Sequence, residues 1–258
     1  DSRGRFARIL EEFEVGSAGP AGFVPGTTTR RFRIIADNCL STLMVPQTLA
    51  QLRSMAPKAT FDLCALPRQG DINQALADGG IDLAVGNAPS PPLLLRTVPL
   101  IDAEIACVVG PNHPLARRKR LTMEEYLDLD HISPSPREAA SLSPIDGKLH
   151  ELGINRRIAA SVPDFALVPY VVSQTDLVFT TCRPFAELVA QMMPLGVLEA
   201  PPEFGIMTFQ LLWHERVHKD PANLWLRRTI RAIGAEVTSI LRPLDSANAS
   251  QRNPVTNS

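Results

Sequence analysis

A strand, a polar turn and a helix are predicted in succession between residues 31 and 57. Phe32 to Ala36 is rich in β-branched and aromatic residues, and from Leu43 to Leu52 the apolar residues recur at helical spacing. A strand that leads directly into a helix is the building unit of an α/β sheet. The chain is therefore expected to fold into that class.

The turn between this strand and helix is rich in residues that cap helices. The candidate caps are Asp37, Asn38, Ser41 and Thr42, and Pro46, which belongs in or near a first helical turn, places the start of the helix close to Ser41. The first amides of a helix lack intrahelical partners and carry roughly half a unit of positive charge, so a small carboxylate suits this end. The same pattern also fits an ordinary first unit of a sheet that binds nothing.

Strands and helices continue to alternate along the chain. Strands are predicted at 60–65, 81–85, 104–110, 132–135, 157–162, 177–181 and 207–213, and helices at 71–78, 123–127, 144–152, 165–173, 185–192 and 221–241. Such alternation favours parallel, doubly wound sheets, and the set that begins at His131 predicts a second lobe.

The composition indicates a globular protein. With 258 residues and 45% hydrophobic content, the chain can bury one large core or two smaller ones. No apolar run approaches the roughly 20 residues of a membrane helix, and the first five residues lack the apolar stretch of a secretion signal, so we expect a cytoplasmic protein with no membrane contact. The formal net charge of -1 gives no bulk attraction to nucleic acid.

The cysteine pattern excludes two kinds of scaffold. The four cysteines are Cys39, Cys64, Cys107 and Cys182. They lie far apart and none belongs to a Cys-x-x-Cys pair, which argues against a zinc ribbon and against a disulfide framework. We expect reduced, mostly buried thiols.

Both ends of the chain differ from the body. Residues 3–14 predict a helix with a narrow apolar stripe, which requires a partner helix, and residues 16–29 form a linker rich in glycine and proline. Residues 242–258 are polar and rich in Asn and Ser, which predicts a disordered tail.

One motif points to a different function. The residues from His214 to His218 read His-Glu-Arg-Val-His, which matches the His-Glu-x-x-His motif of zinc peptidases, with Glu236 as a possible third ligand. Zinc binding requires the five residues to lie inside a helix. Here the strand 209–213 leads into them and Pro221 begins a new helix, so the two histidines are not expected on one helical face. No Gly-x-Ser-x-Gly elbow and no glycine-rich phosphate loop is present.

Several separated stretches together resemble one known family. They are Gly22-Phe23-Val24-Pro25 with Thr28 to Ile34, Ala75-Leu76 with Gly80 to Ala84, Asn112 to Ala116 with Leu121-Thr122 and Glu125-Tyr126-Leu127, and Trp213-His214 with Arg216, Asp220-Pro221-Ala222 and Trp225-Leu226-Arg227. Their order and spacing across residues 22–241 resemble the effector-binding domain of LysR-type transcriptional regulators. The resemblance is greatest to the branch of nodulation and aromatic-degradation regulators.

This resemblance implies an α/β, two-lobed, periplasmic-binding-protein-like (type 2) fold. In it, two doubly wound sheets are joined by two crossover strands, here near residues 104–110 and 207–213. The implied organisation has four parts: residues 1–29 are a remnant of a linker helix and a flexible linker, residues 30–104 plus 212–241 form lobe I, residues 105–211 form lobe II, and residues 242–258 are a disordered tail.

The resemblance also implies a cleft between the lobes that binds a small effector. Carried over by position, the cleft residues are Asn38, Ser41 and Thr42 in lobe I and Ser133, Ser135, Asp164, Phe165, Thr180 and Thr181 in lobe II, the last two being alternatives. Asn38 stands where that branch often has an aromatic residue. No cofactor and no metal is implied.

The implied function is that of a ligand-sensing domain and not of an enzyme. A small, anionic or aromatic effector would bridge the lobes of a homodimer or homotetramer. DNA would be contacted only through an N-terminal winged helix-turn-helix that this chain does not contain. Two alternatives stay open, a solute-binding transport receptor of the same architecture and a zinc metallopeptidase that uses His214, Glu215 and His218.

Overall fold

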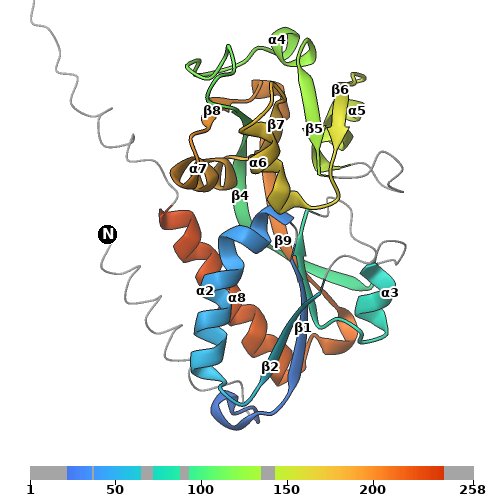
Figure 1. The fold of residues 1–258 in the computed structure, drawn as a ribbon. Helices are drawn as coiled ribbons and strands as arrows, with labels where there is room; N and C mark the ends of the chain where they lie inside the picture. The colour runs from blue at the N-terminus through green and yellow to red at the C-terminus, as the bar shows by residue number, and fades with distance from the viewer. Residues whose placement is uncertain (1–21, 37, 65–71, 88–92, 135–142, 241–258) are drawn as a thin grey trace, which may run out of the picture.

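The computed structural model describes residues 22–36, 38–64, 72–87, 93–134 and 143–240. The helix expected at residues 3–14 and the tail expected at residues 242–258 lie outside these ranges. The described part forms two lobes placed end to end, with two long strands passing between them (Figure 1). The expected α/β, two-lobed fold is thereby confirmed.

Lobe I, as named from here on, contains β1 to β3, α2, α3 and α8. The bounds are β1 Arg31–Ala36, α2 Asn38–Met55, β2 Thr60–Cys64, α3 Ile72–Ala77, β3 Leu83–Gly86 and α8 Pro221–Ile240, with the short 3-10 turn η1 at Pro25–Thr27. The strands β2, β1 and β3 are parallel neighbours. Trp225 of α8 closes the far end of the lobe, with its ring 5.4 Å from that of Phe23 and 5.7 Å from that of Phe32.

Lobe II contains the elements between the two long strands. The bounds are α4 Met123–Leu127, β5 Asp130–Ser133, α5 Pro144–Glu151, β6 Arg157–Ser161, η2 Phe165–Leu167, α6 Val168–Val172, β7 Phe179–Cys182, α7 Arg183–Met192, β8 Gly196–Glu199 and η3 Pro202–Phe204. β5 and β6 are parallel and form a separate two-stranded sheet. The sequence predicted no strand at β8, which pairs antiparallel with β4.

The two crossover strands are β4 (Leu95–Val109) and β9 (Ile206–His214). They pair antiparallel with one another from Leu95 opposite His214 to Glu104 opposite Ile206, with a register shift between Pro99 and Ile101. The main sheet runs in the order β2-β1-β3-β9-β4-β7, with β8 also on β4. It is therefore one mixed sheet through both lobes, and the first crossover strand is longer than the predicted one.

The helix α2 differs from its prediction in one respect. It begins at Asn38, so the expected start near Ser41 is wrong, and Pro46 lies inside the helix. Pro46 has no N–H to donate to the carbonyl of Thr42, four residues earlier. Both residues are exposed, so water can replace the missing hydrogen bond, and the proline is tolerated.

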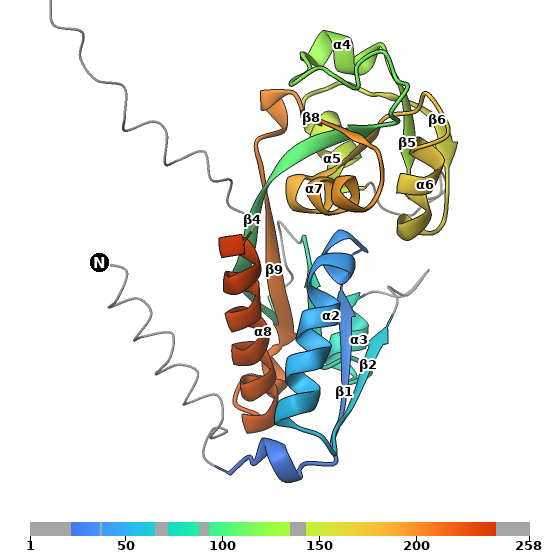
Figure 2. The ribbon, with the colours of Figure 1, turned by 60° about the vertical axis from the view of Figure 1, so that its left-hand side comes forward.

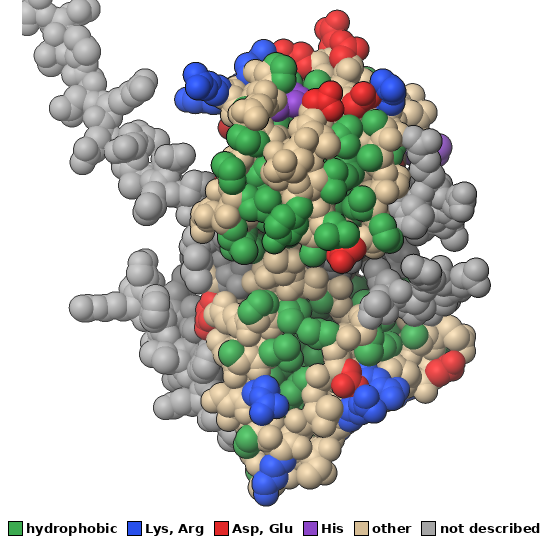
Figure 3. Space-filling model, in the orientation of Figure 1, with side chains coloured by type: hydrophobic (Ala, Val, Ile, Leu, Met, Phe, Trp, Pro, Cys, Tyr) green, Lys and Arg blue, Asp and Glu red, His purple; other side chains and the backbone are tan. Residues whose placement is uncertain are grey.

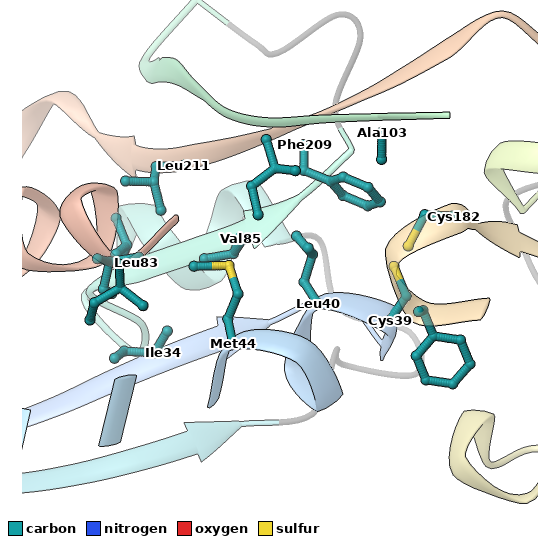
Figure 4. Packing of buried hydrophobic residues seen from close by; sticks show 14 of the residues in the cluster. Ile34, Cys39, Leu40, Met44, Leu83, Val85, Ala103, Cys182, Phe209 and Leu211 are labelled. Carbon is teal, nitrogen blue, oxygen red and sulfur yellow. The ribbon is translucent and has the colours of Figure 1, made fainter. Parts of the chain in front are cut away.

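The largest apolar cluster covers the sheet face under α2 and α8. Met44 and Leu40 of α2 point toward Val85 of β3 and Phe209 of β9 (Figure 4). The same cluster continues into lobe II as far as Phe185, so the two lobes share one apolar interior.

None of the helices in the described ranges is long and apolar enough to cross a membrane.

Candidate functional site

The first turn of α2 lies at the boundary between the lobes (Figure 2). Because β1 runs parallel to β2 and β3, their carboxyl ends share one sheet edge, and α2 begins there directly after β1. α2 is in contact with α7 and η2 of lobe II. The fold therefore presents the amino end of a long helix to the opposite lobe, where an anion is favoured.

The predicted lobe I residues all belong to this end of α2. Asn38 is the first residue of the helix, but its side chain lies outside the described part. Ser41 is half-buried and Thr42 is exposed. Because of Pro46, the Thr42 carbonyl lacks its intrahelical donor and can accept a hydrogen bond from another group. This end therefore offers amide donors, two hydroxyls and one carbonyl.

Two of the predicted lobe II residues lie across the boundary from α2. Asp164 is exposed, and its carboxylate accepts the Ala166 N–H at 2.9 Å, which caps η2. Phe165 is half-buried, with its ring edge-on to Phe179 at 5.4 Å and to Phe185 at 4.8 Å. Since α2 touches η2, the structure brings these two residues near the predicted lobe I set.

The two alternative threonines face opposite sides of β7, because successive residues of a strand alternate. Thr181 is buried opposite Ala106, a member of the shared apolar cluster. Thr180 points into lobe II, where its hydroxyl is 2.8 Å from the Tyr126 hydroxyl. Only Thr181 is thus on the side of the sheet that carries the shared cluster.

The two remaining predicted residues are Ser133 and Ser135. Ser133 is buried at the end of β5, and Ser135 lies outside the described residues. The binding roles of all nine predicted residues stay predictions.

A second buried group of residues lies inside lobe II, and the sequence did not predict it. The Arg156 cluster, as we call it, consists of Arg156, Asp146, Tyr126, Thr180 and His131. The Arg156 side chain is only 3% exposed, and its Nε donates to Asp146 at 2.7 Å. Its terminal nitrogen donates to the Tyr126 hydroxyl at 3.1 Å. It also donates to the Thr180 hydroxyl at 3.3 Å, so the guanidinium is held by one charged partner and two neutral hydroxyls inside the lobe.

The Arg156 cluster shifts the titration of its members. Burial alone would raise the pKa of Asp146, but the hydrogen bond from Arg156 lowers it below its usual value. Burial raises the pKa of Tyr126 to about 12. Burial and the Arg156 charge lower the pKa of His131 to about 4, so this histidine is neutral near pH 7. The cluster is one fixed cation–anion pair among neutral partners, and its role is structural.

An apolar pocket lies in lobe I on the sheet side of α2. Its volume is about 20 Å³, and it is lined by Leu40, Met44 and Thr48 of α2 together with Ile34 and Val85 of the sheet. That volume is close to the minimum that a single water needs, so an organic ring does not fit without movement of α2. We therefore place the candidate site at the lobe boundary and not in this pocket.

The residues of the zinc motif do not form a helical pair. His214 ends β9, and Glu215 begins the 3-10 turn η4 (Glu215–Val217). The His214 Nδ1 accepts the Arg216 N–H at 3.2 Å, while the His218 Nδ1 accepts the Trp213 Nε1–H at 3.3 Å. The two histidines are thus not one α-helical turn apart, which is the spacing that the zinc motif requires.

Hydrophobic side chains gather in the middle of one molecular face, on both sides of the lobe boundary, while charged side chains lie mostly toward its two ends (Figure 3). The large apolar residues that remain exposed include Leu63 of lobe I and Leu167 and Tyr170 of lobe II. The surroundings of the candidate site are therefore largely apolar, with polar groups at the end of α2 and at Asp164.

Comparison with known families and proteins gives a consistent result. Residues 25–234 match the LysR substrate binding domain family. The chain is 28% identical over 206 residues to the HTH-type transcriptional activator NahR of Pseudomonas putida, covering 80% of this chain and 68% of that protein. It is 28% identical over 207 residues to nodulation protein D 1 of Neorhizobium galegae, covering 79% and 64%. The chain thus spans about two thirds of the length of these relatives.

Solved structures agree with the fold. A probable transcriptional regulator of Pseudomonas aeruginosa superposes with a TM-score of 0.70 at 25% identity, covering 86% of this chain and 72% of that one. The effector binding domain of QuiR in complex with shikimate superposes with a TM-score of 0.65 at 18% identity, covering 80% and 97%.

Proposed function

Because this chain belongs to the LysR substrate-binding domain family, we propose that it binds its effector where the first turn of α2 faces lobe II. Family membership makes the chain the ligand-sensing domain of a transcriptional regulator and not an enzyme. The transport-receptor and zinc-peptidase alternatives find no support among these relatives. The observation that carries the proposed site is the amino end of α2, presented at a sheet edge to the opposite lobe.

The effector class follows from what this end of α2 offers. Helix amides and the hydroxyls of Ser41 and Thr42 favour a carboxylate. Phe165 and the apolar side chains of the shared cluster favour an aromatic or alicyclic ring. Shikimate, the ligand named for QuiR, combines a ring with a carboxylate, which supports this class for the present chain.

The effector would act by changing the angle between the lobes. Binding to both lobes shifts the equilibrium between two arrangements by no more than the difference in affinity for them. In the whole regulator, a homodimer or homotetramer located in the cytoplasm, this change would reposition DNA-binding helices outside the described residues. The greater length of the relatives supports a separate DNA-binding part, and we assign it to an N-terminal winged helix-turn-helix.

The test begins with native mass spectrometry of the purified chain, which detects a co-purified small molecule. Isothermal titration calorimetry with benzoate, with shikimate and with neutral benzyl alcohol then measures the preference for an anion. The proposal predicts binding of at least one carboxylate and much weaker binding of benzyl alcohol. A preference for the neutral alcohol would contradict the anionic class.

The position of the site is tested with bulky substitutions in α2. Ser41→Phe and Thr42→Phe should each lower the affinity for the bound carboxylate by about tenfold or more, because an added ring fills the space in front of the helix end. Ser54→Phe is the matched control, since Ser54 is an exposed serine at the opposite end of the same helix. Unchanged affinity in correctly folded Ser41→Phe and Thr42→Phe variants would show that the site lies elsewhere.

A further inference from the structure

Two cysteines from different lobes meet at the boundary. Cys39 is the second residue of α2, and Cys182 ends β7 and is the N-cap residue of α7. Figure 4 shows their side chains pointing toward one another, with the two sulfur atoms between α2 and the start of α7. Both belong to the apolar cluster that the lobes share, and α2 and α7 are in contact.

The two side chains are thiols in this structure and are nearly excluded from water. Cys39 is 7% exposed and Cys182 is 2% exposed. Their positions in the chain are 143 residues apart (182 minus 39), so a bond between them would close a loop that contains the crossover strand β4 and the part of lobe II from α4 to β7. A disulfide at this place would fix the two lobes in the arrangement seen here.

The other cysteines lack this geometry. Cys107 is fully buried in lobe II, where its sulfur is 3.9 Å from the Thr180 hydroxyl and its pKa is raised to about 12 by burial. Its printed partner is thus a residue of its own lobe, so Cys107 is not placed to link lobe II to lobe I. Cys64 ends β2, which pairs only with β1 in the described sheet, at the edge of lobe I. These two cysteines therefore serve as internal controls.

We propose that Cys39 and Cys182 form a reversible disulfide that locks lobe I to lobe II when the protein meets a hydroperoxide. This interlobe thiol pair would make the opening of the candidate site depend on redox state as well as on effector. It depends on the contact between α2 and α7 and not on the identity of the effector, so it can fail independently of the proposed function.

The reaction balances with hydrogen peroxide as the oxidant. One thiol loses its proton and attacks a peroxide oxygen; the O–O bond breaks, the sulfur becomes a sulfenic acid, and the departing hydroxide takes up the proton as water. The second sulfur then attacks the first, the S–O bond breaks, and that oxygen leaves with the second thiol's proton as another water. The two thiols lose two electrons and two protons in total, and one peroxide becomes two waters.

Tryptic peptides identify the bridge directly. Trypsin does not cut between Arg183 and Pro184, so Cys39 lies in the peptide 34–53 and Cys182 in the peptide 158–216, each with a single cysteine. The full chain is treated with hydrogen peroxide, blocked with N-ethylmaleimide, digested without reductant and examined by mass spectrometry. We expect these two peptides to be linked, and the link to disappear after dithiothreitol.

Variants separate the proposed pair from other oxidation. Cys39→Ser, Cys182→Ser and Cys182→Ala should each abolish the linked peptide, whereas Cys107→Ser should retain it. Absence of any link in the peroxide-treated unmodified chain, a link that involves Cys64 or Cys107, or a link between two chains would each overturn the proposal. The unmodified chain decides the question even if a variant fails to fold.

Locking is measured by thermal unfolding of the oxidised and reduced chain. A bridge that closes so long a loop without distorting the fold should raise the midpoint by roughly 5–15 °C. The rise should be absent in Cys39→Ser. A linked chain with an unchanged or lowered midpoint would show that the bridge does not hold the arrangement described here, and the locking role would be withdrawn.

Discussion

The interior of lobe II and the boundary between the lobes are both buried, but they are held by different forces. In the Arg156 cluster, the polar groups are joined by directed hydrogen bonds and an ion pair, such as the 2.7 Å contact from Arg156 to Asp146. At the boundary, α2 of lobe I contacts α7 of lobe II, and the apolar cluster that the lobes share includes Leu40 of α2 and Phe185 of α7. Directed contacts fix one geometry, while apolar contacts have no preferred direction.

This difference indicates which part of the molecule can move. Separating a buried guanidinium from its carboxylate strongly destabilises the folded state. The interior of lobe II is therefore expected to behave as one rigid body. Apolar surfaces can slide or separate at a cost that grows gradually with exposed area, at about 25 cal/mol per Å². A sensing domain needs both properties, because a ligand can change the angle between lobes only if each lobe keeps its own shape.

The largest effect is expected from removing the carboxylate that holds Arg156. Asp146→Ala should lower the free energy of unfolding by about 3–5 kcal/mol, because it leaves a buried cation without its anion. Urea unfolding followed by circular dichroism measures this change. Glu151→Ala is the matched control, since it removes the carboxylate of the exposed Lys148–Glu151 pair on the same helix and should cause no measurable change. If the two variants changed the free energy of unfolding equally, the buried ion pair would contribute no more to stability than the exposed one.

The next effect is a dependence of stability on pH that originates in lobe II. The pKa of His131 is about 4 in the folded chain and near its ordinary 6.5 when unfolded, so between these values the unfolded state binds more protons. The contribution of His131 to the free energy of unfolding is therefore fully present above about pH 6.5. It decreases as the pH falls toward 4, by roughly 3 kcal/mol in total.

This contribution can be isolated by comparing variants at about pH 7 and about pH 4.5. The loss of unfolding free energy between the two conditions should be smaller in His131→Phe than in the unmodified chain. His150→Phe, which changes an exposed histidine on α5, should leave the loss unchanged. Parallel losses in the unmodified chain and His131→Phe would show that His131 titrates alike in both states.

The smallest of these effects is expected on the lobe II side of the boundary. Phe165→Leu removes two edge-on ring contacts from a half-buried position and should lower the free energy of unfolding by about 1 kcal/mol. Leu167→Ala, at a half-exposed residue of the same 3-10 turn, should change it by less than about 0.5 kcal/mol. If Phe165→Leu cost as much as Asp146→Ala, the lobe II side of the boundary would be held as firmly as the Arg156 cluster and the contrast would fail.

The sequence predicted the features that depend on local pattern. The strand leading into α2, the strand that runs into His214 and the helix from Pro221 follow from periodicity and caps, and the broken zinc motif follows from the last two. The start of α2 was placed too late because Pro46 was assumed to require an early position. An exposed proline can stay inside a helix when water satisfies the freed carbonyl, and burial is not visible in a sequence.

The Arg156 cluster could not be predicted in the same way. Tyr126, His131, Asp146 and Thr180 come from α4, β5, α5 and β7, and Arg156 precedes β6. No spacing rule joins residues of separate elements, and an arginine next to a strand is more often exposed than buried. The sequence also could not predict which of Thr180 and Thr181 faces the shared apolar cluster. Strand alternation places the two on opposite sides of β7, but only the packing of the lobe determines which side each one occupies.

The pairing of β4 with β9 has a mechanical consequence. Because the two connections between the lobes are hydrogen-bonded to each other, they act as a single ribbon and not as two independent linkers. Sliding one strand along the other would break the hydrogen-bond ladder, whereas changing the twist of the ribbon keeps it. Rotation of one lobe against the other is thus reduced to torsion about one axis. The register shift at Leu100 interrupts the ladder near its middle, where a bulged strand bends and twists most, and so locates the most compliant point of that axis.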